Sequence, residues 1–96
     1  MTFIHIVLLP VKTTAPKELV AKVVTELNAL SKHIPYVLKS RCGATVTQRG
    51  QQYTHALLVE LESGDQLQAY NDHAAHQAVL ADIKKIISEP SLAMDF

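Results

Sequence analysis

The first apolar stretch of the chain, residues 3–11, has the pattern of a β-strand with two apolar faces. It is rich in β-branched residues, which favour strands. Alternate positions give two apolar sets, namely Phe3, Val7, Leu9 and Val11 on one face and Ile4, Ile6 and Leu8 on the other. A strand that is apolar on both faces is normally covered on both faces. We therefore expect protein on both sides of the sheet at this strand.

From residue 16 to residue 32 the apolar positions change to the spacing of an amphipathic helix. The apolar stripe consists of Leu19, Val20, Val23, Val24, Leu27 and Leu30. The run Thr13-Thr-Ala-Pro16, with a threonine near the N-cap and proline in the first turn, is typical of a helix start. Pro35 follows the stripe and indicates its end.

The rest of the chain predicts three more strands and one more helix. Residues 37–47 form a less buried strand, in which Gly43 indicates a bulge or a sheet edge. Residues 48–52 form a turn and residues 53–62 a third strand, covered on both sides. The S-x-x-Q spacing of Ser63 and Gln66 predicts a capping box for a helix that ends by residue 90 and is interrupted near Asn71 and Asp72. Residues 91–96 form the last strand.

The order βαββαβ predicts a ferredoxin-like α+β fold, a four-stranded antiparallel sheet with both helices on one face. The 96 residues form one domain, residues 1–96. Two helices leave the second apolar face of the sheet uncovered, and no further element remains to cover it. We therefore expect an isologous homodimer, sheet against sheet, which is a dimeric α+β barrel.

Composition excludes several classes of function. Nine basic and nine acidic residues balance, with no run of like charge, so we expect neither nucleic acid nor an anionic membrane as a partner. The single Cys42 leaves no disulfide framework and no multi-cysteine metal site, which favours a reducing compartment and a cytoplasmic location. The apolar start lacks the basic region and cleavage site of a signal peptide and is too short to span a bilayer.

His76 is the clearest candidate for chemistry, because it lies in the middle of an apolar helical stripe. At 100° per residue, five apolar residues fall within roughly 80° of it, namely Val79, Leu80, Ile83, Ile86 and Ile87. A buried ring without a hydrogen-bond partner costs about 1–3 kcal/mol. His76 is therefore either a core histidine bonded within the protein or a group that meets a ligand.

Five segments, in chain order, resemble the stress-responsive A/B barrel family of dimeric α+β barrels. They are Ile4-His5-Ile-Val-Leu, Ile34-Pro35, residues 43–48, Tyr53-Thr-His55-Ala-Leu, and Ala69-Tyr70 with His73-x-x-His76. Within that family the pattern is similar to plant polyketide cyclases of the olivetolic acid cyclase type. These close a linear poly-β-ketone by an aldol reaction without a metal or organic cofactor. The family also contains stress proteins with no established chemistry, so the resemblance implies the fold more strongly than the activity.

The resemblance implies that His76 is the catalytic base and that the Tyr70 hydroxyl stabilises a carbonyl or enolate oxygen. The substrate-binding residues that it implies are His5, His55, His73, Leu9, Val23, Val24, Leu27 and Leu57. His5 and His55 would line the same cavity as His76. Leu27 replaces a pocket tyrosine of the plant cyclase, which predicts a wider, more aliphatic pocket. On one unbroken helix Tyr70 would lie about 120° from His76, so a shared site requires the interruption near Asn71.

Other functions stay open on the sequence alone. The first is a non-catalytic stress-response or ligand-binding barrel, and the second is a cofactor-free aromatic monooxygenase, since similar small barrels include such enzymes. A third is a zinc site of His73, His76 and either His5 or His55. The spacing of three residues between His73 and His76, and the lack of a suitably placed carboxylate, count against zinc. The favoured interpretation is a cyclase-like enzyme with no cofactor and a hydrophobic small-molecule substrate.

Overall fold

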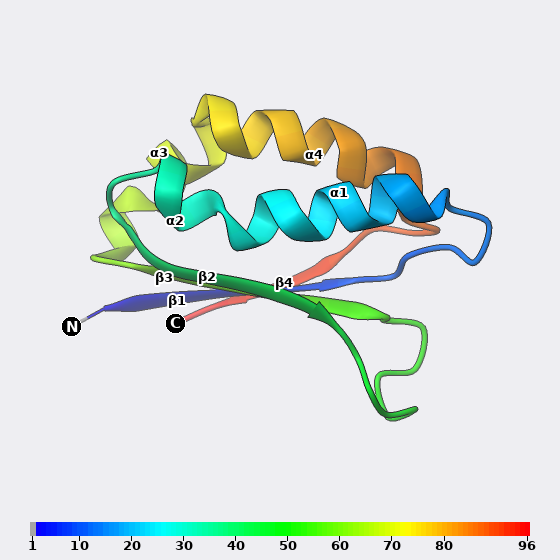
Figure 1. The fold of residues 1–96 in the computed structure, drawn as a ribbon. Coiled ribbons are helices and arrows are strands. Elements are labelled where there is room, and N and C mark those ends of the chain that lie inside the picture. Colours follow the sequence, from blue (N-terminus) through cyan, green and yellow to red (C-terminus); the bar gives the residue numbers. More distant parts are fainter. Residues whose placement is uncertain (1) are drawn as a thin grey trace.

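A computed structural model describes residues 2–96 as a four-stranded antiparallel sheet with every helix on one face (Figure 1). The elements are β1 (Phe3–Leu9), α1 (Lys17–Asn28), α2 (Leu30–His33), β2 (Val37–Ala44), β3 (His55–Leu61), the 3₁₀ helix η1 (Gly64–Gln66), α3 (Leu67–Asp72), α4 (Ala74–Ile86) and β4 (Leu92–Asp95). The strand order is β2-β3-β1-β4, which confirms the predicted ferredoxin-like fold. None of the helices described has the length and apolar character needed to cross a membrane.

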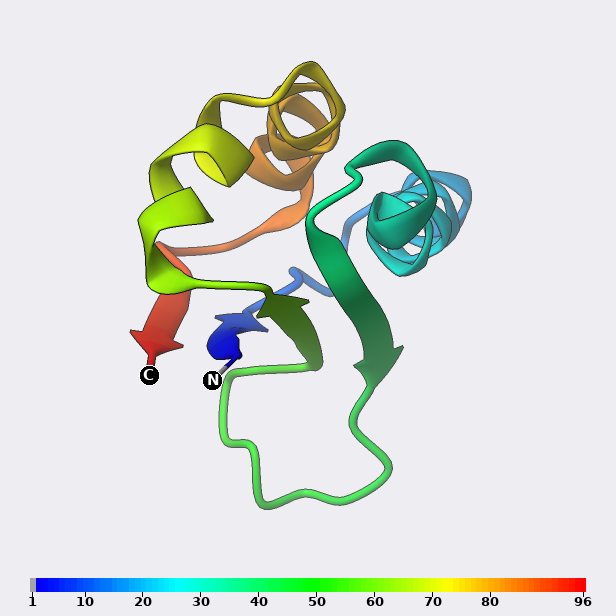
Figure 2. The same ribbon diagram turned by 90° about the vertical axis from the view of Figure 1, so that its left-hand side faces the viewer.

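The helix-facing side of the sheet forms the core. β1 lies between β3 and β4, so His5 is opposite Val59 on one side and Asp95 on the other. The inward residues of β3 are buried against the helices, namely Leu57, Val59 and Leu61. Figure 2 shows α1 and α4 side by side above the sheet, with the β2–β3 loop extending from the opposite side.

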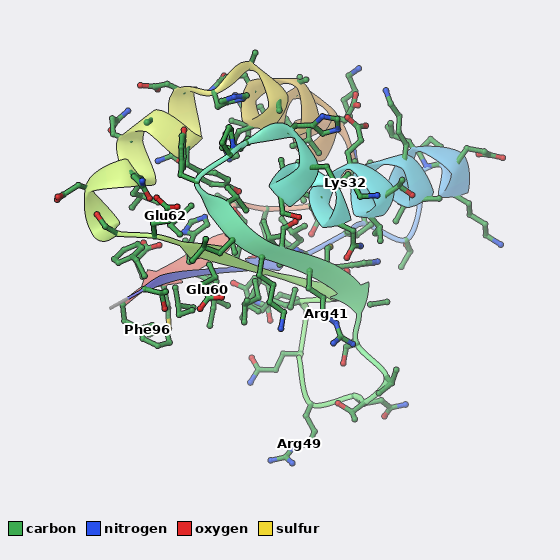
Figure 3. The ribbon with its side chains drawn as sticks, turned by 60° about the vertical axis from the view of Figure 1, so that its left-hand side comes forward. Lys32, Arg41, Arg49, Glu60, Glu62 and Phe96 are labelled. Carbon is green, nitrogen blue, oxygen red and sulfur yellow. The ribbon has the colours of Figure 1, made fainter. Side chains whose placement is uncertain are left out.

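The other side of the sheet is open and apolar at its centre. Its exposed large residues include Leu58, Leu92, Met94 and Phe96, with exposed fractions of 37%, 50%, 71% and 70%. Arg41 and Glu60 also lie on this side (Figure 3). The predicted second apolar face therefore exists, and no element among residues 2–96 covers it.

The first helix begins where the sequence predicted, but a different residue occupies its cap. Pro16, predicted in the first turn, is the N-cap of α1, and no side chain caps the helix, so neither Thr13 nor Thr14 is the cap. Proline suits this position because a helix start leaves the N–H that proline lacks unused. At the other end, Asn28 accepts a hydrogen bond from the Cys42 N–H and donates one to the Cys42 carbonyl, which ties α1 to β2.

All four strands are shorter than predicted, β1 and β4 by two residues each, and the irregularity in β2 lies elsewhere. β2 is an edge strand, as predicted, but it ends at Ala44, and its register shift lies between Val37 and Lys39 instead of at Gly43. β3 begins at His55. The polar residues between these strands form a loop because they have no apolar face to bury.

The second helical segment is broken, as the sequence predicted. Ser63 and Gln66 form the expected capping box in front of α3. The chain then leaves the helix at His73, which has an extended backbone with ψ 139°, one residue after the predicted interruption. The Nδ1 atom of His73 accepts a hydrogen bond of 3.1 Å from the Ala75 N–H and so caps α4.

Candidate active site

A small cavity lies between the sheet and the two long helices, against the edge strand β4. Its volume is about 170 Å³. Most of its wall is apolar, and three of the residues predicted to line a pocket, Leu9, Leu27 and Leu57, do so. The two polar rings in this wall are His5 from β1 and His76 from α4. The cavity therefore offers an apolar space with imidazole groups in its lining.

His76 lies in the first turn of α4, with one ring nitrogen held by the backbone. Its Nδ1 lies 2.9 Å from the carbonyl oxygen of Asn71, at the end of α3. Because a carbonyl only accepts hydrogen bonds, Nδ1 carries the proton and Nε2 holds the free electron pair. Burial lowers the pKa of His76, the Asn71 hydrogen bond opposes this, and the nearby His5 lowers the pKa further. The ring is therefore neutral near pH 7 and able to accept a proton at Nε2.

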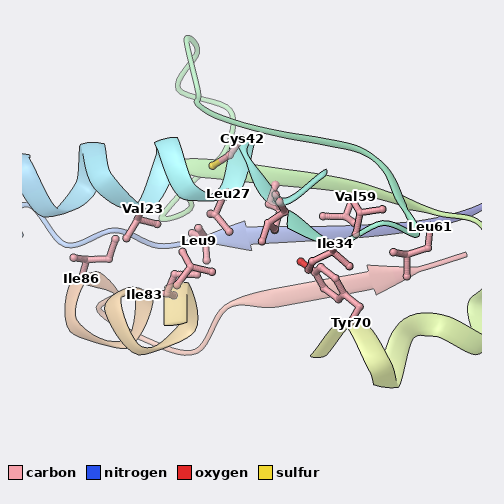
Figure 4. Close-up of a cluster of buried hydrophobic side chains, with 14 residues drawn as sticks. Leu9, Val23, Leu27, Ile34, Cys42, Val59, Leu61, Tyr70, Ile83 and Ile86 are labelled. Carbon is pink, nitrogen blue, oxygen red and sulfur yellow. The ribbon is translucent and has the colours of Figure 1, made fainter. Parts of the chain in front are cut away.

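Tyr70, at the end of α3, is fully buried against both histidines. Its ring centroid lies 4.7 Å from that of His76 and 5.6 Å from that of His5. Figure 4 shows its hydroxyl pointing inward from α3, beside Ile34. Within residues 2–96 this hydroxyl has no hydrogen-bond partner. Burial raises the pKa of Tyr70, so it stays protonated and is a hydrogen-bond donor without an acceptor.

The break at His73 explains how these rings meet. α3 and α4 are separate helices, so Tyr70 is not held at the angle from His76 that one continuous helix would impose. Tyr70 does not itself line the cavity, but its ring lies beside the two imidazoles that do.

Asp95 joins this group as the partner of His5, a pairing that the sequence did not predict. Asp95 on β4 lies opposite His5 on β1, and its Oδ1 is paired with His5 Nδ1. The pair joins residues 90 positions apart. In the sequence, the indication of this pair was an acidic residue at a helix-facing position of the last strand. Its partner can be identified only from the register of β4 against β1.

The structure does not bring His55 into this cavity, so the prediction of a shared cavity is wrong for that residue. His55 is opposite Leu9, at the far end of β1, four residues along β3 from Val59. At about 3.3 Å per residue it is roughly 13 Å from the level of His5. His55 Nδ1 lies 2.7 Å from the Thr54 hydroxyl, and the side chain lines a separate hollow of about 250 Å³ beside Tyr53.

Three further predicted pocket residues also lie outside the cavity wall. His73 caps α4, Val23 is buried in the core, and Val24 is half-buried against it. The sequence could place these residues on the inward side of their elements, but it could not show whether they reach the cavity wall. With Leu27 in the wall and both valines outside it, the pocket is aliphatic as predicted but small.

The described residues do not form the zinc site that the sequence left open. No group of three or more histidine, cysteine or acidic side chains within residues 2–96 has metal-binding proximity. His73 uses Nδ1 to cap α4, and His55 lies at the other end of the sheet. The histidines that share the cavity are His5 and His76 alone among the five.

Comparison with known proteins identifies relatives over the full length of the chain. A family model described as the stress responsive A/B barrel domain matches residues 3–96. A dimeric ferredoxin-like protein of unknown function from Thermobifida fusca is 30% identical, with a TM-score of 0.84 over 100% of this chain and 90% of that one. No curated protein matches the chain significantly.

Two plant structures are more distant in sequence and similar in fold. A protein from Arabidopsis thaliana is 21% identical, with a TM-score of 0.83 over 98% of this chain and 92% of that one. The hydroxynitrile lyase from Passiflora edulis is 12% identical, with a TM-score of 0.85 over 99% of this chain and 91% of that one. At these identities the likeness concerns the fold alone.

Proposed function

This chain belongs to the stress responsive A/B barrel domain family, and on that basis we propose that it is a cofactor-free enzyme of carbonyl chemistry. His76 is its general base and Tyr70 its oxygen-stabilising donor. The reaction that fits these groups best is an aldol-type cyclisation of a short poly-β-ketone. The main support is the buried Tyr70 hydroxyl, which lacks an acceptor and lies beside a neutral imidazole at a small apolar cavity.

The chemistry of the base follows from the hydrogen bond that His76 makes. Its Nδ1–H is committed to the Asn71 carbonyl, so the basic nitrogen is Nε2. A methylene group between two carbonyls is acidic enough for imidazole, with an unperturbed pKa of about 6.5, to act as its base near neutral pH. General-base catalysis of this kind typically contributes about 10²–10⁴-fold.

The role of Tyr70 follows from its missing partner. An unpaired buried hydroxyl costs about 1–3 kcal/mol, and the cost is recovered when an acceptor arrives. An enolate or alkoxide oxygen of a bound substrate would be that acceptor. Such a donor acts most strongly on the charged oxygen of the transition state, because the hydroxyl is buried in a largely apolar core.

The size of the cavity limits the substrate. An apolar cavity of about 150 Å³ holds a benzene molecule, so about 170 Å³ suits a chain that closes to a single six-membered ring. The wall residues Leu9, Leu27 and Leu57 have no polar group that could hold the substrate in an extended form. They favour a folded substrate in which the carbanion and the ketone meet.

The open face of the sheet supports a homodimer. Its apolar centre would be buried by the same face of a second copy, in an isologous contact. The relative from Thermobifida fusca is described as dimeric. The cavity lies on the opposite face, between sheet and helices, so the proposed dimer would leave the histidines in place.

A second function, a non-catalytic barrel that binds a small apolar ligand, is favoured by one observation. The Nδ1 of His76 is bonded to a backbone carbonyl, as in many structural histidines. The hydroxynitrile lyase of Passiflora edulis, by its name a lyase, shows only that this fold can hold an active site.

The test is a screen of short β-diketones, β-triketones and cyanohydrins with metal-free protein, followed by mass spectrometry. We expect a cyclised or cleaved product from the wild type and none from His76→Ala. The control is His33→Ala, which removes an exposed histidine at the end of α2. Tight binding without turnover would support the non-catalytic barrel, equal turnover by His76→Ala would remove the base assignment, and oxygen incorporation would favour a monooxygenase.

A further inference from the structure

The His5–Asp95 pair forms the second histidine centre of the cavity. The two residues are directly opposite on β1 and β4, with His5 Nδ1 paired to Asp95 Oδ1. The His5 side chain is 10% exposed and that of Asp95 is 34% exposed, so the pair extends from the cavity wall towards water. The position of His5 is otherwise a core position, opposite Val59, where an apolar residue would pack without any partner.

The pair fixes which nitrogen of His5 is available. A carboxylate only accepts hydrogen bonds, so Nδ1 is the donor to Asp95 and Nε2 is the remaining nitrogen. Within residues 2–96 no hydrogen bond involves the Nε2 atom of His5 or of His76. Both cavity histidines are therefore held at Nδ1 and offer Nε2.

The hydrogen-bond partners of the His5 and His76 Nδ1 atoms differ in charge, and this difference gives the two rings different roles. Asn71 presents a neutral carbonyl to His76, whereas Asp95 presents a carboxylate to His5. A carboxylate attracts an imidazolium, and a carbonyl does so much less. The other groups that face His5 are Tyr70 from α3 and His76 from α4, and its neighbour on β3 is the apolar Val59.

We propose that Asp95 is a positioning residue that holds His5 as the proton donor of the reaction in which His76 is the base. This rests on the proposed function. His76 Nε2 takes a proton from the substrate carbon, and the electron pair left there forms the new bond to the carbonyl carbon. The π pair of that carbonyl moves to its oxygen, which takes a proton from Nε2 of protonated His5. One proton enters His76 and one leaves His5, and both rings then exchange protons with water, with no oxidant or reductant needed.

The first part of the test is spectroscopic and needs no substrate. Long-range ¹⁵N–¹H spectra of the wild type, Asp95→Asn and Asp95→Glu report the proton on each ring nitrogen of His5. We expect a strongly deshielded Nδ1–H in the wild type, its loss in Asp95→Asn and its return in Asp95→Glu. The control is Asp65→Asn, which changes an exposed carboxylate of η1. An unchanged His5 spectrum in Asp95→Asn would overturn the positioning role.

The second part uses turnover of the substrate found in the screen. We expect kcat to fall by about 10²-fold in Asp95→Asn and in His5→Gln at similar KM, the lower end for acid–base catalysis. Asp95→Glu should recover most of this loss, which a general loss of folding would not allow. Full kcat in His5→Gln, with none in His76→Ala, would overturn the donor role and leave the proposed base intact. If His76→Ala also keeps full kcat, the proposed function itself fails.

Discussion

Replacing Tyr70 with phenylalanine should make the protein more stable and slow the proposed reaction. The hydroxyl is buried and has no partner in the described chain, which costs about 1–3 kcal/mol. Phenylalanine keeps the ring between His5 and His76 and removes only that cost, since the oxygen it loses leaves little empty volume. In a domain of 60–100 residues each 1 kcal/mol corresponds to about 4–8 °C in Tm. We therefore expect Tm to rise by about 4 °C or more.

The same substitution should lower kcat, because removing one oxyanion donor typically costs about 10²–10³-fold. Stability is measured by thermal and urea unfolding at one fixed protein concentration, since a dimer melts in a concentration-dependent way. The matched control is Tyr53→Phe, at a half-buried tyrosine outside the cavity, for which we expect a change within about 0.5 kcal/mol. A loss of stability in Tyr70→Phe would mean that the hydroxyl has a partner in the free protein, and the argument for an awaiting acceptor would fail.

Three further changes test other parts of the structure. Burial lowers the pKa of His76 and of His55 below the ordinary 6.5, so the unfolded chain takes up protons first as the pH falls. The stability that these neutral rings contribute is present above about pH 6.5 and is lost as the pH falls below it. The free energy of unfolding in urea should therefore be lower at pH 5.5 than at pH 7.5, and this difference should be smaller in His76→Gln than in the wild type. Leu27→Phe should fill part of the cavity of about 170 Å³ and abolish turnover while Tm stays within a few degrees; undiminished kcat would mean that the substrate does not enter there. Met94→Glu places a charge on the open sheet face and should give monomers in sedimentation, whereas Val46→Glu, at an exposed loop residue, should not; an unchanged dimer would refute the sheet-to-sheet contact.

The apolar pattern predicted the fold because each element has a local period. Alternation in residues 3–11 gave β1 with two apolar faces, and the helical stripe around His76 gave α4. The break between Tyr70 and His76 was also predictable, since Asn71 and Asp72 compete locally with helix. The end of β2 at Ala44 depends on where pairing with β3 stops, and no local period reports that.

The candidate site was predictable only in part, because its geometry depends on register. Alternation gives the face on which a strand residue lies, but not its position along the sheet. His55 therefore shared a predicted face with His5 but lies at the other end of β1. Asp95 meets His5 across 90 positions of sequence, so no nearby pattern could link them.

The pairing of β1 with β4 has a consequence for how the chain folds during its synthesis. At about 5–20 residues per second of synthesis, the interval between residues 5 and 95 is roughly 5–20 s, since they lie 90 positions apart. Contacts of such long sequence separation form late in folding, after the local helices and the β2–β3 pairing. An emerging chain can thus have most of its core while Ser91 and Ala93 are still missing from the cavity wall and Asp95 has not yet paired with His5. On this order of events the His5–Asp95 pair forms after most of the core, when β4 completes the edge of the sheet.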